Sequence, residues 1–402
     1  MVTEIRDALR STADAAAVDL HPLEEVVAAG SRRVRHRRVV TGLGTTGLAL
    51  AIAVGAATLT VDDDRADVPL PANLTLDDAK PASLEVLSSR TAPWDVPDDA
   101  DGVPAFTEDR LVVQGRGRLG KGTFQLGLLD PDAGTTDWLP QPPTPLGQLS
   151  AVELGARRLL YFDWQGNREL SVLQFDRDSR SWSRAAIDVP RGDYDPLFGA
   201  VPPQLASDGR LYLLDPDNAR RWYSVPSTGG TVRPEPSLEG TWASWSGSMR
   251  ATGDGEGRIV VTRDGQPVAE VEGPPESCSK QQTVPTIPPL VAFVGSRFVA
   301  TFTCGDGNQV VVYDESGRVE IMLAVTKELR VDAAGDGHLL LSDARRLYLL
   351  NLDSQELTWV DTMQPRETPD ADLEAGLVVW DTVVWNTERD AWDTVHKVAR
   401  LP

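Results

Sequence analysis

The stretch Leu128-Leu129-Asp130-Pro131-Asp132, followed by Trp138, is the clearest copy of a unit that recurs along most of the chain. In this unit a run of strand-forming residues ends at an aspartate, a turn follows, and the next strand carries a tryptophan. An aspartate at the mouth of a hairpin accepts hydrogen bonds from the backbone two residues further on, which favours the turn. The unit therefore predicts a β-hairpin that contributes one large aromatic side chain to a core.

Seven copies of this unit can be found, and the residues that mark their second strands are 33 to 50 positions apart. These residues are Trp138, Trp182, Trp222, Val271, Ile321, Trp359 and Trp392. A period of about 40 residues holds four short strands with their connections. We therefore expect an all-β fold of about seven four-stranded sheets, with six or eight sheets also compatible. A solenoid would require a shorter and stricter period, and tandem sandwiches would require linkers that the sequence does not show.

In spacing, turn chemistry and aromatic placement these units resemble the blades of the WD40-like or kelch-like β-propeller superfamily. The resemblance covers about residues 83–400 and is one of architecture. The Gly-His and Trp-Asp pairs of WD40 repeats and the paired glycines of kelch repeats are absent. It implies a β-propeller over residues 101–402, with a strand from 83–95 that closes the ring.

A different signal precedes the repeats: residues 39–61 contain no charged side chain. As a helix these residues reach about 34 Å, enough for a hydrocarbon core of about 30 Å. A buried helix of a soluble protein would instead show a polar stripe. We therefore expect one transmembrane helix at 39–61, a short helical arm at 1–38 and an acidic, Pro-rich connector at 62–100.

The residues that flank this segment predict its orientation. A basic cluster precedes it and three aspartates, at 62–64, follow it. The cluster consists of Arg32, Arg33, Arg35, Arg37 and Arg38. By the positive-inside rule the arm is then cytoplasmic and the propeller extracytoplasmic, in a single-pass protein of the cell membrane. A cleaved signal peptide is the alternative, but its charged region would be unusually long.

The layout of a short arm, one span and an outer domain resembles that of single-span anti-sigma regulators of GC-rich bacteria. The basic residues are almost all Arg, which is typical of such genomes and favours a bacterial origin. The resemblance implies a cytoplasmic regulator, similar to a sigma factor, as partner of the arm. However, the zinc-binding module of those regulators has a His and a Cys-x-x-Cys pair, whereas this arm has His21 and His36 and no cysteine.

Composition excludes several classes of function. The net charge of −21 argues against binding to nucleic acid, which requires a surplus of cations. Two cysteines and four histidines exclude a Cys-rich zinc site, and we expect neither a metal nor a cofactor. Cys278 and Cys304 both follow the predicted span, so a disulfide in an oxidising compartment is expected, with two buried thiols as the alternative.

No motif of a known catalytic site is present, and His338 and His396 are interpreted as structural residues. Trp164, Trp242 and Trp245 lie near predicted turns and are the candidate binding surface, although packing between blades would also explain them.

The predicted function is therefore that of a membrane-anchored binding or scaffolding module at the cell envelope, with a protein or glycan ligand outside. A transmembrane sensor that acts through its arm, and a propeller enzyme of the envelope, are the alternatives.

Overall fold

The aspartates and asparagine of the repeated unit form the turns that the sequence predicts. Asp130 accepts hydrogen bonds from the backbone N–H groups of Asp132 and Ala133, each at 2.9 Å. Asp176 accepts one from Ser179 at 2.7 Å, and the turns at Asp314 and Asn351 are built in the same way. In each turn, the side-chain oxygen thus accepts hydrogen bonds from backbone N–H groups of the same turn. The strand that follows therefore starts in a fixed register.

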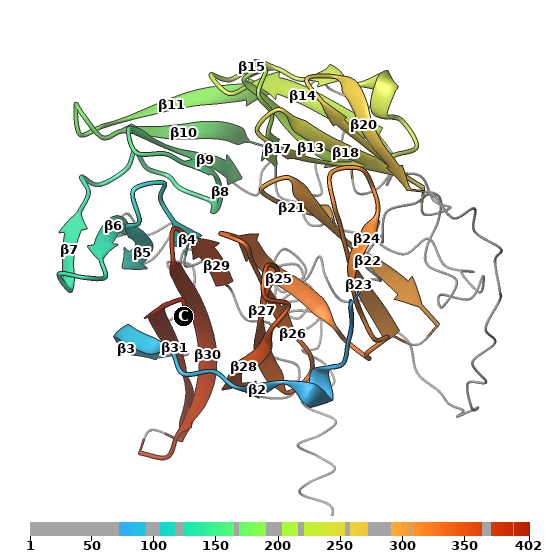
Figure 1. Cartoon of the computed structure of the whole chain (residues 1–402). Helices are drawn as coiled ribbons and strands as arrows, with labels where there is room; N and C mark the ends of the chain where they lie inside the picture. The colour runs from blue at the N-terminus through green and yellow to red at the C-terminus, as the bar shows by residue number, and fades with distance from the viewer. Residues whose placement is uncertain are drawn as a thin grey trace, which may run out of the picture.

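The computed structural model describes residues 72–93, 105–116, 124–164, 169–189, 203–215, 221–253, 258–271, 291–305, 307–363, 371–388 and 390–402. These residues form seven sheets around a common centre (Figure 1). The prediction of a seven-bladed, all-β propeller is confirmed. The helices among the described residues are the short 3-10 turns η1 (Leu76–Asp78) and η2 (Pro236–Leu238).

Each sheet is one blade, whose strands follow one another from the centre of the ring outward. Blade 1 contains β4 (Ala105–Phe106), β5 (Val112–Arg116), β6 (Gln125–Asp130) and β7 (Thr135–Trp138). Blade 2 contains β8 (Gln148–Leu154), β9 (Arg158–Trp164), β10 (Leu170–Asp176) and β11 (Ser181–Asp188). Blade 3 contains β12 (Gln204–Leu205), β13 (Arg210–Asp215), β14 (Arg221–Pro226) and β16 (Arg233–Pro234). Blade 4 contains β17 (Trp242–Ser246), β18 (Met249–Gly253), β19 (Ile259–Arg263) and β20 (Gln266–Val271).

The remaining blades follow the same order. Blade 5 contains β21 (Val291–Val294), β22 (Arg297–Cys304), β23 (Gly307–Tyr313) and β24 (Val319–Leu323). Blade 6 contains β25 (Arg330–Gly335), β26 (His338–Ser342), β27 (Arg346–Asn351) and β28 (Leu357–Thr362). Blade 7 contains β29 (Ala371–Glu374), β30 (Leu377–Asn386), β31 (Ala391–Arg400) and β3 (Glu85–Pro93).

Blade 7 joins the two ends of the described chain. Its outer strand β3 precedes all other blades in sequence and pairs antiparallel with β31, from Glu85 opposite Arg400 to Pro93 opposite Asp393. Before β3, the short strands β1 (Ala72–Leu74) and β2 (Lys80–Pro81) add in parallel to the outer edges of blades 5 and 6. We call residues 72–93 the strap, because they run along three consecutive blades.

Residues 72–93 of the predicted connector at 62–100 pair with the blades, and β3 lies where a ring-closing strand is predicted, at 83–95. The first two strands of the strap contain three and two residues, too few to show any alternation of apolar and polar side chains. Of the remaining N-terminal predictions, the arm at 1–38 and the span at 39–61 lie outside the described residues. Within the described ranges, the structure contains no helix with the length and apolar character that a membrane crossing requires.

The apolar side chains form seven buried clusters, one at each junction between neighbouring blades. The cluster between blades 5 and 6 contains Val299, Val312 and Leu341, and the one between blades 1 and 2 contains Leu126 and Phe175. The other five clusters lie at the remaining junctions. The core is therefore not at the centre of the ring but distributed between the sheets.

The repeated unit occupies two different positions in the blades. Five copies join the third strand of a blade to the fourth, but the copies at Trp222 and Trp392 join the second strand to the third. In blade 7 the reason is the ring closure, because β3 supplies the fourth strand and no such hairpin can form. In blade 3 the chain between the third and fourth strands first adds β15 (Gly230–Thr231) to β11 of blade 2.

The alternating strand direction gives the ring two different ends. At one end, turns join the first strand of a blade to the second and the third strand to the fourth. We call this end the turn face. We call the other end, with the turns between second and third strands and the connections between blades, the connection face. No two strand ends on the turn face are joined by more than six residues, whereas the strand ends joined by residues 189–203 (15 residues) and by 272–290 (19 residues) are on the connection face.

Gly335 provides a test of how closely the inner strands approach one another. A Cβ atom on Gly335, at the end of β25, would lie 2.4 Å from the carbonyl oxygen of Leu373 in β29. Gly134 has a φ of +65° but open space around it. We expect Gly134→Ala to lower the free energy of unfolding by about 1 kcal/mol, through backbone strain alone. Gly335→Ala should lower it by more than about 2 kcal/mol, because backbone must move.

Chemical denaturation of the two variants and the unmodified protein measures this difference. Equal stability of the two variants would contradict the contact between blades 6 and 7.

Candidate functional site

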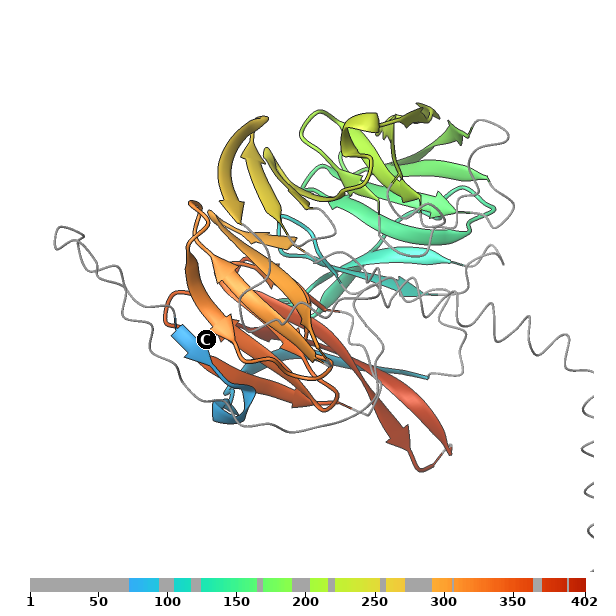
Figure 2. The same ribbon diagram turned by 90° about the vertical axis from the view of Figure 1, so that its right-hand side faces the viewer.

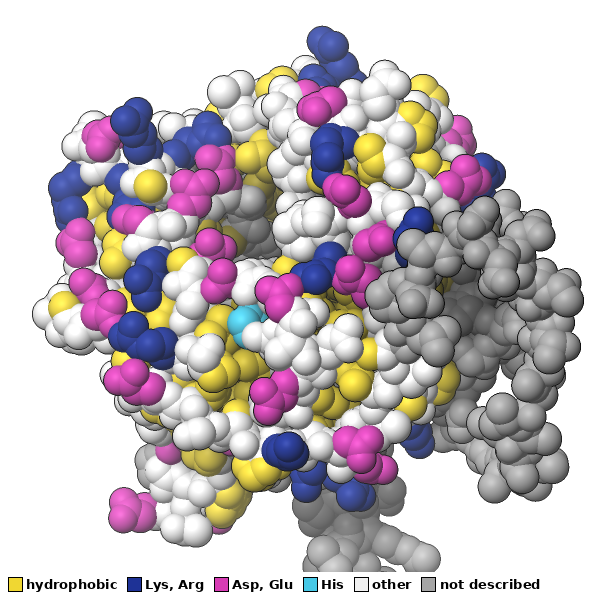
Figure 3. Space-filling view, viewed as in Figure 1, with side chains coloured by type: hydrophobic (Ala, Val, Ile, Leu, Met, Phe, Trp, Pro, Cys, Tyr) yellow, Lys and Arg dark blue, Asp and Glu magenta, His cyan; other side chains and the backbone are white. Residues whose placement is uncertain are grey.

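The turn face is held together by charged groups that bridge neighbouring blades. Arg177 of blade 2 donates to both carboxylate oxygens of Asp109 in blade 1, each at 2.7 Å. This hydrogen-bonded guanidinium holds the pKa of Asp109 below its usual value. Arg180 of blade 2 binds Asp137 of blade 1 at 2.7 Å. Figure 3 shows Lys and Arg side chains interspersed with Asp and Glu over the face in view.

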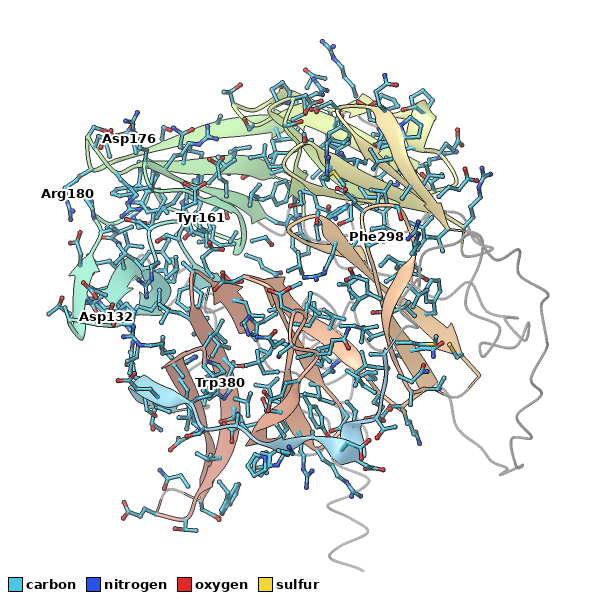
Figure 4. The ribbon with its side chains drawn as sticks, in the orientation of Figure 1. Asp132, Tyr161, Asp176, Arg180, Phe298 and Trp380 are labelled. Atoms are coloured by element: carbon cyan, nitrogen blue, oxygen red, sulfur yellow. The ribbon has the colours of Figure 1, made fainter. Side chains whose placement is uncertain are left out.

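The same arrangement recurs at other junctions. Arg297 of blade 5 binds Asp353 of blade 6 at 2.7 Å, and Arg400 of blade 7 binds Asp132 of blade 1 at 2.9 Å. Figure 4 places Asp132, Asp176 and Arg180 at the outer turns, while Tyr161 and Phe298 lie within the blades. The charges of the turn face therefore serve the assembly of the ring.

A group of acidic side chains lies at the inner end of this face, on blades 6, 7 and 1. Asp372 of β29 accepts hydrogen bonds from the N–H groups of Phe106 and Leu373, each at 2.8 Å, and burial raises its pKa. Burial, followed by the charges of Asp372, Asp336 and Glu108, also raises the pKa of Glu374. Among the described residues no group of three His, Cys, Asp or Glu side chains has the arrangement of a metal site. The group links blade 7 to blade 1 through Asp372.

His338 belongs to the same region and has a structural role. Its Nδ1 lies 2.7 Å from the carbonyl oxygen of Asp336, and its Nε2 lies 3.0 Å from the side-chain amide of Asn351. A carbonyl can only accept, so Nδ1 donates and Nε2 accepts from the amide. Both ring nitrogens are therefore engaged in holding two turns of blade 6.

Of the three predicted binding tryptophans, Trp245 packs between blades 3 and 4. Its ring stacks on Tyr212 with centroids 4.4 Å apart and contacts the edge of Trp222 at 5.4 Å. Trp222 in turn donates from Nε1 to the carbonyl oxygen of Thr241 at 2.8 Å. Trp245 is thus part of the junction cluster, which is the alternative that the sequence left open.

Trp164 and Trp242 lie elsewhere, at strand ends on the connection face. Trp164 ends β9, opposite Gln148 and Leu170, and packs against the cluster between blades 2 and 3. Trp242 begins β17, opposite Gly253. The structure therefore does not assemble the three tryptophans into one surface.

Two other groups of predicted residues are only partly described. Cys304 is buried at the connection-face end of β22, whereas Cys278 lies outside the described residues. The basic cluster at Arg32–Arg38 also lies outside them. The disulfide and the membrane orientation therefore stay predictions.

The most exposed aromatic side chain of the described residues is one that the sequence did not single out, Trp385 in the hairpin of β30 and β31. Trp385 is 45% exposed and its neighbour Val384 is 41% exposed. Within the described residues of blade 7, β29 pairs with β30 only as far as Trp380, and β3 pairs with β31 only from Asp393 onward. The hairpin tip therefore extends past both strands that flank it (Figure 2). The repeat unit that contains Trp385 and Trp392 was the sequence signal for this hairpin. Its pattern, however, predicts an ordinary blade turn and not an exposed tryptophan.

Comparison with known proteins assigns no family to the chain. No protein-family model and no curated protein matches the sequence. Among solved structures, a chain of a mitotic checkpoint complex is 12% identical with a TM-score of 0.45, covering 89% of this chain and 99% of that one. The WD40 propeller domain of Doa1 is 11% identical with a TM-score of 0.43, covering 78% and 96%. Sqt1 of Saccharomyces cerevisiae is 13% identical with a TM-score of 0.41, covering 74% and 83%.

Asp372 and Asp109 should influence stability with opposite dependence on pH. The pKa of Asp372 is higher in the folded than in the unfolded protein, so its contribution to stability falls as pH rises from about 4 through the folded pKa. Asp372→Asn should therefore gain stability relative to the unmodified protein as pH rises. The pKa of Asp109 is lower in the folded protein, so its contribution is lost as pH falls, and Asp109→Asn should lose relative stability as pH rises.

Urea denaturation between about pH 3 and about pH 7, a range that includes the usual carboxyl pKa values, measures both trends. Parallel curves for the two variants would show that the two carboxylates do not differ in environment.

Proposed function

We propose that this chain is a binding or scaffolding module anchored in the cell membrane, which presents the connection face of its propeller to a protein or glycan ligand outside the cell. The observation that carries the proposal is the difference between the two faces. On the turn face the turns are short, and ion pairs connect neighbouring blades. The long connections start and end at strand ends on the connection face, and binding residues in rigid folds are concentrated on such loops.

The point at which the chain enters the fold supports the anchor. The predicted span ends at Val61, and the first described strand begins at Ala72 on the outer edge of blade 5. The intervening residues 62–71 extend over at most about 35 Å. A tether attached to the rim in this way leaves both faces of the ring accessible.

We also propose the disulfide between Cys278 and Cys304. The connection 272–290, which contains Cys278, joins β20 to β21 on the connection face, and Cys304 ends β22 at the same end of blade 5. The bond would constrain the longest connection of the propeller. Loop closure over the intervening residues would contribute about 3.5 kcal/mol of stability.

Alkylation of the denatured protein tests this bond. We expect no cysteine to react with iodoacetamide before reduction and both to react after it, as measured by intact mass. Two labels before reduction would show that the thiols are free.

The ligand face is tested with a pair of positions in blade 3. A photoreactive side chain at Glu239, in the connection from β16 to β17, should form adducts with a macromolecule of the envelope when the full chain is expressed in its native cells. The same group at Ser207, in a turn of the turn face, should not. Both residues are exposed, so they differ mainly in the face that they occupy.

The topology is tested on the same cells. Protease added to spheroplasts should digest the propeller and leave a small fragment that contains residues 1–38. A propeller protected from protease would refute the orientation.

In the crosslinking experiment, adducts confined to Ser207 would refute the assignment of the ligand face. Removal of residues 1–30 should leave the Glu239 adduct unchanged in a module that only binds.

A further inference from the structure

We propose that the junction between blades 7 and 1 binds the phosphate group of a larger ligand between the guanidinium groups of Arg90 and Arg116. Arg90 belongs to β3 of blade 7, and Arg116 is the last residue of β5 in blade 1. The inference adds a site to the proposed function. It rests on contacts within the propeller and depends neither on the membrane anchor nor on the disulfide.

Each of the two guanidinium groups is held in place by a glutamine. Arg90 donates from Nη1 to Oε1 of Gln114 at 3.1 Å. Arg116 donates from Nε and from Nη2 to Oε1 of Gln125, at 3.0 and 2.5 Å. Among the described residues neither guanidinium pairs with a carboxylate. Both therefore keep a positive charge that no neighbouring anion neutralises.

The two glutamines are themselves oriented by blade 1. Gln114 donates from Nε2 to Oγ1 of Thr136 at 2.6 Å, and Gln125 donates from Nε2 to the carbonyl oxygen of Leu139 at 2.5 Å. An amide whose N–H group donates to a fixed acceptor presents its oxygen in a fixed direction. The arginines are thus positioned before a ligand arrives, which lowers the entropic cost of binding.

The ring of Trp138 also supports Arg116. The guanidinium carbon of Arg116 lies 3.8 Å from the centroid of this ring, which is the geometry of a cation–π contact. Gly127 of β6 lies opposite Trp138 and leaves space for the ring, since a Cβ atom on Gly127 would lie 2.7 Å from it. Stacking and hydrogen bonds thus fix Arg116 and leave its Nη1 for a ligand.

The two guanidinium groups lie over the same face of blade 1. Val112 of β5 belongs to the cluster between blades 7 and 1, so Gln114 and Arg116, two and four residues further on, face blade 7 as well. Two residues of a strand extend over about 7 Å. The head groups held at these two positions are therefore close enough for one phosphate group to accept hydrogen bonds from both.

The local charge at this junction is positive although the chain is acidic. Residues 111–129 contain three basic side chains and no acid, whereas the whole chain has 60 acids and 39 basic residues. On blade 7, His396 of β31 separates Arg90 from Asp381 of β30. Charges beyond about 8 Å are largely screened at physiological salt, so the nearby arginines decide which ions bind.

Two neighbouring arginines favour a phosphate over a carboxylate. A phosphate monoester carries about −1.5 to −2 charges and three acceptor oxygens, enough for two guanidinium groups. A carboxylate has one charge and two oxygens, which a single guanidinium satisfies. Both arginines are exposed, so a phosphate that is attached to a larger group can reach them. The site therefore fits a ligand such as a phosphorylated sugar.

The test titrates inorganic phosphate, glucose phosphate, glucuronate and glucose into the purified full chain at constant ionic strength, followed by isothermal titration calorimetry. We expect both phosphates to bind, glucuronate to bind about tenfold more weakly, and glucose not to bind. Glucuronate that binds as tightly as glucose phosphate would overturn the preference for phosphate. Glucose phosphate that does not bind would overturn the site.

Substitutions separate this site from the general charge of the surface. Arg116→Gln should weaken the binding of glucose phosphate about tenfold or more, because a charged hydrogen-bond donor is lost. Arg346→Gln is the matched control, because Arg346 is also exposed and lies over a tryptophan of its own blade, Trp359, at 5.4 Å. It should bind glucose phosphate as tightly as the unmodified protein.

Arg90→Gln tests the contribution of blade 7 and should weaken binding to a similar extent. Thermal unfolding establishes that each variant is folded. Undiminished binding by Arg116→Gln, or an equal loss in Arg346→Gln, would overturn the site. A variant at position 116 that loses stability but binds normally would show that the arginine serves only the packing of blade 1.

Discussion

Every sheet in this protein has two apolar faces, and each face can be buried only against the next sheet. This constraint explains why the apolar side chains form one cluster at each of seven junctions. It also explains the ring, because an open row of blades would leave two faces in water. The closing junction between blades 7 and 1 receives additional polar support from the Asp372 carboxylate and from the Arg400–Asp132 pair. The turn face therefore uses its charges to stabilise contacts that the apolar clusters already define.

The sequence predicted the hairpins well because their signal is local. An aspartate at 130 or 176 bonds to backbone two or three residues away, so spacing along the chain contains the information. Which pair of strands a hairpin joins is decided by distant residues, and the repeat pattern contains no prediction of it. Trp222 and Trp392 look like the other repeat tryptophans, but β15 reaches into blade 2 and β3 replaces the last strand of blade 7. The seven-fold repeat could be counted from sequence, whereas the position of a unit within its blade could not.

The candidate binding residues show the same limit of local reasoning. Trp245 has a turn on one side, yet Tyr212 and Trp222 of the neighbouring blade cover its ring. Trp385 has similar surroundings in sequence, but its strand continues past β29 and the side chain is exposed. Whether a tryptophan at a turn is packed or exposed thus depends on the length of neighbouring strands. Those lengths are set by pairing between segments far apart in the chain.

The strand that closes the ring also determines when the ring can form. Glu85 pairs with Arg400, which is 315 positions later in the chain (400 minus 85). During synthesis β3 is made before blades 1 to 6, but its partner β31 is made after all of them. Until then the faces of blades 1 and 7 have no complete partner, and contacts of such high sequence separation form slowly. The pairing of β3 with β31 thus delays completion of the ring until blade 7 has been translated.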